Sequence, residues 1–268
     1  MGLIFASVKF SMVKLIMDNS DTIPMNDLIR EAVAAGLAYG HKKTKTHPRM
    51  KKYVSMKKNE IDVLDPEASL QSLGIAIDFL SEKARQGGLL LLVGTQPAAQ
   101  ELMKNIAEEF NFPYVIERWL GGTLTNFKVI SGRVARYETL KKEMAEGGLD
   151  KYTKKERLDI HKEFAKMEKN FKGLVNLKRL PDALLVIDPG LHDTAMREAK
   201  RLSIPVAAIM DTDDDPEAGD YPIIANDHAK SSISWIMEKI AEAIKSAKTE
   251  IAEIAESKPP AEDSGQSV

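Results

Sequence analysis

The sequence contains no cysteine. Disulfide bonds, thiolate zinc sites and cysteine nucleophiles are therefore excluded together, and we expect a reducing, cytoplasmic setting. Long apolar runs are also missing, because no segment reaches the roughly 18 uninterrupted apolar residues that a membrane-spanning helix needs. The apolar start of the chain is interrupted by Lys9 and Lys14 and is followed by no small-residue cleavage site. We expect residues 1–24 to be an N-terminal extension, with a mis-assigned translation start as its simplest explanation.

A large excess of either charge is absent too, because the formal net charge at pH 7 is only −2. The charges are nevertheless unevenly placed. Residues 41–58, the basic block, hold eight Lys or Arg and two His without any acid. Such a block is the pattern expected for phosphate contacts, although a charge run is also typical of a plain solvated surface. Residues 246–268 carry five acids against Lys248 and Lys258, so we expect an acidic, largely disordered tail.

The usual nucleotide-binding fingerprints are missing as well. The stretch GTQPAAQ at 94–100 has one glycine where a dinucleotide-binding loop needs three, and no GxxxxGK[ST] motif occurs. We therefore expect no cofactor. A divalent metal is one alternative, because Asp188 and Asp211 follow neighbouring predicted strands and could bind a cation together with His41. Helix capping and turn formation are simpler roles for the two carboxylates.

Short apolar runs alternate with amphipathic segments along most of the chain. A helix is predicted from Asn26 to Gly36, and a β-hairpin over 53–65 has its turn at 57–59. The alternation that follows predicts an α/β fold with a doubly wound parallel sheet, whose functional edge lies at the carboxyl ends of the strands. The predicted strands are 89–94, 113–117, 182–189, 204–212 and 221–227, and the predicted helices are 66–85, 97–110, 193–202 and 227–244.

A segment of different texture interrupts this alternation. Apolar residues recur at spacings of three and four over 127–144 and again over 160–174. Two such helices joined by a polar turn predict an antiparallel helical hairpin of coiled-coil type. We therefore divide the chain into an α/β domain (25–127 and 175–245), an inserted hairpin (128–174) and the two terminal segments.

The stretch RWLGGTLTNF at 118–127 lies between a predicted strand and the first hairpin arm. Its glycine pair allows a sharp turn, with Trp119 and Leu120 packed beneath it. The same glycines would also allow a bulky partner to approach closely, with Arg118 and the polar side chains as hydrogen-bond donors to phosphates and sugars. The sequence leaves both interpretations open.

Five motifs in order resemble the bacterial form of the ribosomal protein S2 family. They are AGLAYGHKKTKTHPRMKKYV (35–54), LLVGTQPAAQE (91–101), RWLGGTLTNFK (118–128), LPDALLVIDP (180–189) and IPVAAIMDTDDDPE (204–217). The resemblance implies a flavodoxin-like sheet with a protruding helical hairpin. It also implies a role without catalysis, in which the protein binds small-subunit ribosomal RNA between head and body and contacts neighbouring ribosomal proteins, including ribosomal protein S1, without any membrane.

The basic block and the stretch 118–128, called the glycine loop below, together provide the expected RNA-binding set. It comprises His41, Lys42, Lys43, Lys45, Arg49, Lys51, Lys52, Arg118, Trp119, Gly121, Gly122, Thr123, Thr125, Asn126 and Lys128. The alternative function is a metabolic enzyme with a Rossmann-like domain, in which RWLGGTLTN would bind the anion of a phosphorylated small molecule. Such an enzyme would need a positioned acid, base or metal, for which only His41, Asp188 and Asp211 are candidates.

Overall fold

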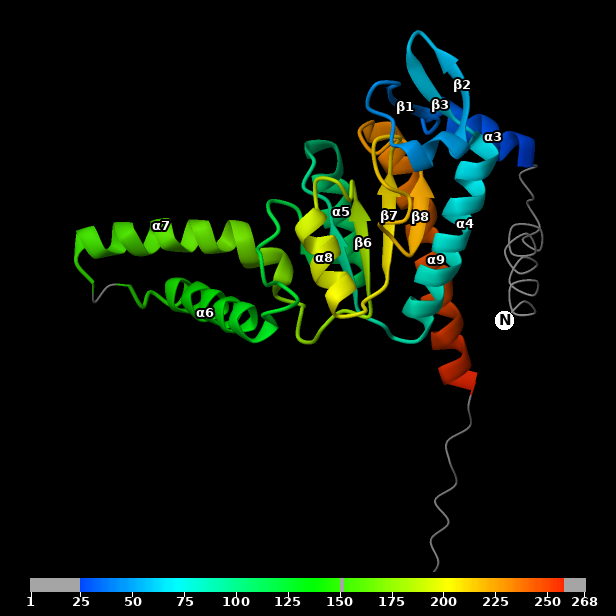
Figure 1. Ribbon diagram of the computed structural model, residues 1–268. Coiled ribbons are helices and arrows are strands. Elements are labelled where there is room, and N and C mark those ends of the chain that lie inside the picture. Colours follow the sequence, from blue (N-terminus) through cyan, green and yellow to red (C-terminus); the bar gives the residue numbers. More distant parts are fainter. Residues whose placement is uncertain (1–24, 150–151, 258–268) are drawn as a thin grey trace, which may run out of the picture.

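The computed structural model describes residues 25–149 and 152–257 and is centred on a parallel β-sheet (Figure 1). Its five strands lie in the order β5-β4-β6-β7-β8, and every neighbouring pair is parallel. Counted along the chain, this is the strand order of the flavodoxin-like fold, so the expected fold class is confirmed. The strands are β4 (Leu90–Val93), β5 (Tyr114–Val115), β6 (Ala183–Ile187), β7 (Val206–Met210) and β8 (Tyr221–Ile224).

Helices cover both faces of the sheet, because its central strands are apolar at every position. All residues of β4, β6 and β7 are buried, as expected for parallel strands between two layers. Leu90 belongs to the core on one face and its neighbour Leu91 to the core on the other. The first core includes α4 (Pro66–Arg85), α5 (Pro97–Phe110) and α9 (Lys230–Ser257), and the second includes α8 (Asp193–Arg201).

A small antiparallel sheet stands beside the carboxyl ends of the parallel strands (Figure 1). It consists of β1 (Tyr39–Lys42), β2 (Val54–Lys58) and β3 (Ile61–Leu64), and it follows α3 (Met25–Ala34). The predicted hairpin is β2 and β3, but its turn is centred on Asn59 and Glu60, whose φ values are 51° and 63°. The sequence did not predict β1, which is short and half polar and pairs with β3.

The inserted segment forms two helices, α6 (Phe127–Ala145) and α7 (Lys154–Phe171), which project side by side from the rest of the molecule (Figure 1). The Tyr137 and Phe164 rings stack between them with centroids 5.6 Å apart. At the base, Ile130, Val134 and Phe171 are buried in the same core as the β4 and β6 strands. The hairpin is therefore anchored in the α/β core at its base. Heptad packing of coiled-coil type along its length stays a prediction.

The final helix differs from its predicted extent at both ends. It begins at Lys230, so Asp227 and His228 lie in the loop before it, and it continues to Ser257. Residues 246–257 are thus helical and form the first part of the predicted acidic tail. Lys248 is part of this packing, because its ammonium group lies 4.6 Å from the Phe112 ring centroid and donates to the Phe110 carbonyl at 3.2 Å. The segments 1–24 and 258–268 lie outside the described residues.

No helix in the ranges 25–149 and 152–257 is both long enough and apolar enough to span a membrane.

The base of the hairpin should matter for folding much more than its far end. Replacing residues 141–160 by a short Gly-Ser linker should lower the free energy of unfolding by only about 2–5 kcal/mol, because it removes one buried side chain, Leu149, and leaves the core residues at the base. Replacing 129–172 removes Ile130, Val134 and Phe171 from the core, and each such loss costs about 2–5 kcal/mol. Urea unfolding followed by circular dichroism compares the two variants. Equal loss from both would contradict this division of the hairpin.

Candidate functional site

The loop 118–126 is built around one carboxylate from another part of the chain. Glu198 of α8 is 7% exposed, and its carboxylate lies within hydrogen-bond distance of the loop. Its Oε1 accepts hydrogen bonds from Trp119 Nε1 at 3.1 Å and from the Gly122 amide at 2.7 Å. Its Oε2 accepts from the amides of Leu124 and Thr125 and from the Thr125 hydroxyl, each at 3.0 Å. Successive backbone amides that converge in this way form an anion-binding nest, and here the anion belongs to the protein itself.

These hydrogen bonds keep Glu198 charged although it is buried. Burial raises the pKa of Glu198, but the hydrogen bonds from Thr125, Gly122, Trp119 and Leu124 outweigh burial and hold the pKa below its ordinary value. Gly122 supplies the required backbone shape with a φ of 90°, which side-chain-bearing residues rarely adopt. A Cβ atom there would also lie 3.1 Å from the Asn126 Cβ atom. Gly121, by contrast, has open space around the position of a Cβ atom.

This geometry shows which members of the expected RNA-binding set have their donors occupied inside the protein. Trp119 and Thr123 are buried, and the Thr123 hydroxyl donates to the Leu120 carbonyl at 2.6 Å. The amides of Gly122 and Thr125 and the Thr125 hydroxyl already donate to Glu198. Their donors are therefore used inside the protein. The exposed members of the loop set, in addition to Thr125, are Arg118, Gly121, Asn126 and Lys128.

The basic block is divided between side chains that pair with acids of the protein and side chains that do not. Arg49 contacts Asp215 at 2.7 Å and Glu217 at 3.2 Å, and His41 contacts Asp211 at 3.0 Å. The lysines instead are exposed and form no ion pair with any described residue. Lys42 is the last residue of β1, and Lys43 and Lys45 follow it. Lys51 and Lys52 lie in the short helix η1 (Pro48–Tyr53). Lys57 and Lys58 at the β2 hairpin are exposed as well and extend this surface beyond the expected set.

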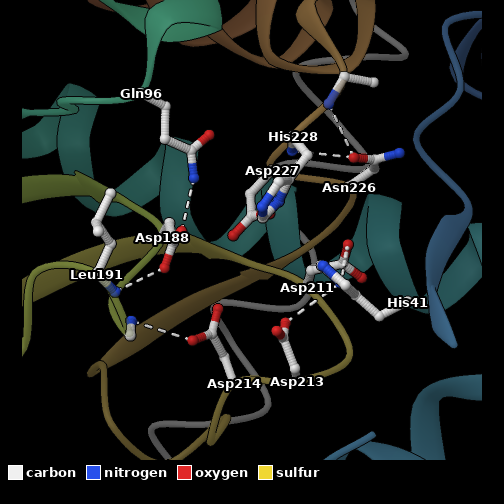
Figure 2. A network of polar contacts seen from close by, with 12 residues as sticks. His41, Gln96, Asp188, Leu191, Asp211, Asp213, Asp214, Asn226, Asp227 and His228 are labelled. Atoms are coloured by element: carbon white, nitrogen blue, oxygen red, sulfur yellow. Dashed lines mark hydrogen bonds and ion pairs between the residues drawn. The ribbon is translucent and has the colours of Figure 1, made fainter. Parts of the chain in front are cut away.

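His41 belongs to a polar cluster at the carboxyl edge of the parallel sheet (Figure 2). Asp188 follows β6 with a φ of 61° and accepts from Gln96 Nε2 at 2.6 Å and from the Leu191 amide at 2.8 Å. Asp214 accepts from the Gly190 amide at 3.1 Å, while its other carboxylate oxygen is buried without a partner among the described residues. Asp227 pairs with His228, whose ring lies edge-on to that of His41 with centroids 4.9 Å apart.

Crowding of carboxylates shifts the acid–base behaviour of the cluster. Burial, followed by the nearby charges of Asp188 and Asp211, raises the pKa of Asp227 to about 10. Burial and the Asp188 charge likewise raise the pKa of Asp214 to about 7. The hydrogen bond to Asp211 raises the pKa of His41 above its ordinary value. Close carboxylates destabilise one another's charged forms, so the cluster favours bound protons or a cation.

Two overlapping groups within the cluster have the residue types and spacing of a divalent metal site. Donor atoms of His41, Asp211 and His228 lie within 4.8 Å of one another, and so do those of Asp188, Asp227 and His228. The structure thus brings the three suggested ligands His41, Asp188 and Asp211 to one edge, but it divides them between the groups. Sequence reasoning missed Asp227 and His228, because the last helix was expected to start at Asp227.

The chain is similar to known proteins over most of its length. The family model described as "Ribosomal protein S2" matches residues 32–247. The "Small ribosomal subunit protein uS2" of Rhodopirellula baltica is 40% identical over 82% of this chain and 84% of its own length. Proteins of the same name from Thermus thermophilus and Fusobacterium nucleatum are 38% and 41% identical, over 83% and 81% of this chain and 87% and 88% of their own lengths.

Glu198→Gln should lower stability sharply, although the side chain keeps its shape. The amide nitrogen of Gln would face hydrogen-bond donors, and buried donors left unpaired cost about 1–3 kcal/mol each, so we expect a loss of roughly 3 kcal/mol in the free energy of unfolding. Because the folded pKa of Glu198 is depressed, its contribution is present above the ordinary value of 4.5 and is lost as pH falls through the folded value.

Chemical denaturation of both proteins at neutral pH and near pH 3 measures this difference. The gap between wild type and variant should shrink at the lower pH. The exposed Glu238→Gln on α9 is the control, and it should change the free energy of unfolding by less than about 0.5 kcal/mol. A Glu198→Gln protein as stable as this control would contradict the role assigned to the carboxylate.

Proposed function

The chain belongs to the ribosomal protein S2 family, and from this premise we propose that it acts within the small ribosomal subunit by binding RNA phosphates through its exposed lysines. It is a structural ribosomal protein and not an enzyme, and it associates with the RNA and proteins of the ribosome. The observation that carries this conclusion is the match over residues 32–247 together with identities near 40% over most of the chain. The alternative of a metabolic enzyme has no support from these relatives.

The exposed lysines of the basic block are the first proposed RNA contact. Lys42, Lys43, Lys45, Lys51 and Lys52 are all exposed and form no ion pair with a described residue. Lysines that neutralise phosphates release counterions, which supplies much of the affinity for nucleic acid and makes it depend on salt. We propose that this surface and the exposed residues Arg118 and Lys128 contact small-subunit RNA between the head and body of the subunit.

The two residues of the block that pair with acids have a different proposed role. His41 and Arg49 connect the small antiparallel sheet to acids that follow β7 of the parallel sheet. They therefore orient the lysines without contacting RNA themselves. Trp119 and Thr123 are buried, so in this proposal they shape the loop and do not contact RNA themselves. As a further partner we propose ribosomal protein S1, which the family resemblance implies.

We also propose that the polar cluster at the carboxyl edge of the parallel sheet, called the acidic cluster below, binds one divalent cation. Imidazole and carboxylate ligands suit Zn²⁺ among the common metals. His228 is shared by both candidate groups and lies 55% exposed, so an ion could enter from solvent. A cation would offset the mutual repulsion of the carboxylates.

Neutralising the outward lysines should weaken RNA binding in a salt-dependent way. With Lys42, Lys43, Lys45, Lys51 and Lys52 changed together to Gln, the slope of log affinity against log salt should fall by about one to four units, since each phosphate contact contributes roughly 0.7–0.9. Filter binding to the isolated small-subunit RNA across a salt series measures the slope. Arg49→Gln is the control and should leave the slope nearly unchanged, because its guanidinium already contacts Asp215 and Glu217. An unchanged slope in the fivefold variant would show that the block is only a solvated surface.

Zn²⁺ should stabilise the purified protein through His228. A ligand at about 100 times its Kd adds roughly 2.7 kcal/mol to the free energy of unfolding, which corresponds to a rise of several degrees in Tm. His228→Ala should abolish that rise, whereas His161→Ala on the exposed hairpin should retain it. Differential scanning calorimetry with and without Zn²⁺ makes the comparison. A Zn²⁺-dependent rise that persists in His228→Ala would contradict the assigned ligands.

A further inference from the structure

A second cationic site lies where the hairpin joins the α/β core. A cavity of about 190 Å³ opens there between α5, the end of β5 and the last turn of α7. Lys104 and Arg118 line it from the core side, and Lys169 and Lys172 line it from the hairpin side. The hairpin side reaches this position because the short helix η2 (Lys172–Leu174) lies directly on β5: a Cβ atom at Gly173 would collide with the Tyr114 carbonyl oxygen.

The charges in this cavity are unbalanced. Glu117 is its one lining carboxylate, and it already pairs with Lys169 at 3.1 Å. Lys104 has only a distant partner, Glu108, at 3.9 Å. Arg118 and Lys172 are both exposed and have no ion pair with any residue in the described ranges. Four cationic side chains and one carboxylate therefore line one small cavity, and a bound anion would offset this surplus of positive charge.

The size and position of the cavity limit what the anion can be. Sites for whole small molecules usually measure roughly 300–1,000 Å³, so this cavity is better matched to one small group of a larger molecule. A single phosphate group is small, and both guanidinium and ammonium groups bind phosphates well. Arg118 also begins the loop that Glu198 holds in place, so its backbone position is set before any partner binds.

We propose that this cavity binds one backbone phosphate of the structured RNA that the protein contacts. The inference rests on the proposed function and adds to it a defined site at the hairpin base. A phosphate held there contacts groups from both sides of the junction, with Arg118 on the core side and Lys172 on the hairpin side. Binding therefore connects the direction of the hairpin to the bound RNA. Neither the basic block nor the acidic cluster contributes a residue to this cavity.

The double variant Arg118→Gln/Lys172→Gln tests the site. Because neither side chain pairs with a residue that the structure describes, the variant should fold with an unchanged circular dichroism spectrum. Its affinity for small-subunit RNA should fall at least about tenfold, since hydrogen bonds to charged groups are the strong ones. The slope of log affinity against log salt should fall by about one unit, as expected for the loss of one phosphate contact.

The matched control is Lys230→Gln/Lys245→Gln on α9. These lysines are 67% and 72% exposed and take part only in surface ion pairs with Glu101 and Glu109. The control removes the same charge and should bind RNA like the wild type. Equal losses in the two double variants would reduce the effect to net charge and overturn the proposal.

Phosphate ethylation interference identifies the bound group directly. Ethylation of one particular phosphate should block the wild type and the control, but it should have no further effect on the Arg118→Gln/Lys172→Gln protein. An interference pattern shared by all three proteins would overturn the proposal while leaving RNA binding intact. Normal RNA binding by the double variant, with failure to enter small subunits, would show that the cavity binds a protein and overturn the proposal equally. If the wild type itself did not bind the RNA, the proposed function would fail first.

Discussion

The functional surface of this protein depends on one buried ion, the carboxylate of Glu198. A charged group that is 7% exposed is unstable unless it is hydrogen-bonded, and five donors from residues 119–125 meet this need. The loop takes its shape by surrounding that carboxylate, and α6 starts directly after it at Phe127. The position of Arg118 and the departure of the hairpin from the core therefore both follow from a contact that the RNA does not make.

Charge is arranged by a similar principle at the other end of the sheet. Burial, together with the charges of the neighbouring carboxylates at the strand ends, raises the pKa of Asp227 to about 10. His41 and Arg49 offset part of this negative charge and connect the small antiparallel sheet to the parallel one. Their lysine neighbours are left facing solvent. A chain with a net charge of −2 can thus present strongly basic surfaces, because its acids are concentrated elsewhere.

Features with a local cause were predictable from the sequence, and features that depend on distant contacts were not. The buried strands follow from continuous apolar runs, and the approach of Asp211 to Asp188 follows from the geometry of parallel strands. The strand β1 was missed because its half-polar residues are held by pairing with β3 and by a hydrogen bond from the His41 amide to Thr212. Glu198 gave no signal at all, since its partners lie 73 to 79 residues earlier in the chain. The glycine loop therefore suggested an external ligand for donors that the protein itself occupies.

The distribution of this protein in a cell lysate shows whether it is an RNA-bound component of the small ribosomal subunit. Tagged protein is followed through a sucrose gradient at moderate salt, with the RNA of each fraction identified. We expect the protein to sediment with small subunits. We also expect a rise in salt to release it, since lysine–phosphate contacts weaken with ionic strength. A protein found only in the free pool at the top of the gradient, at every salt concentration, would contradict it.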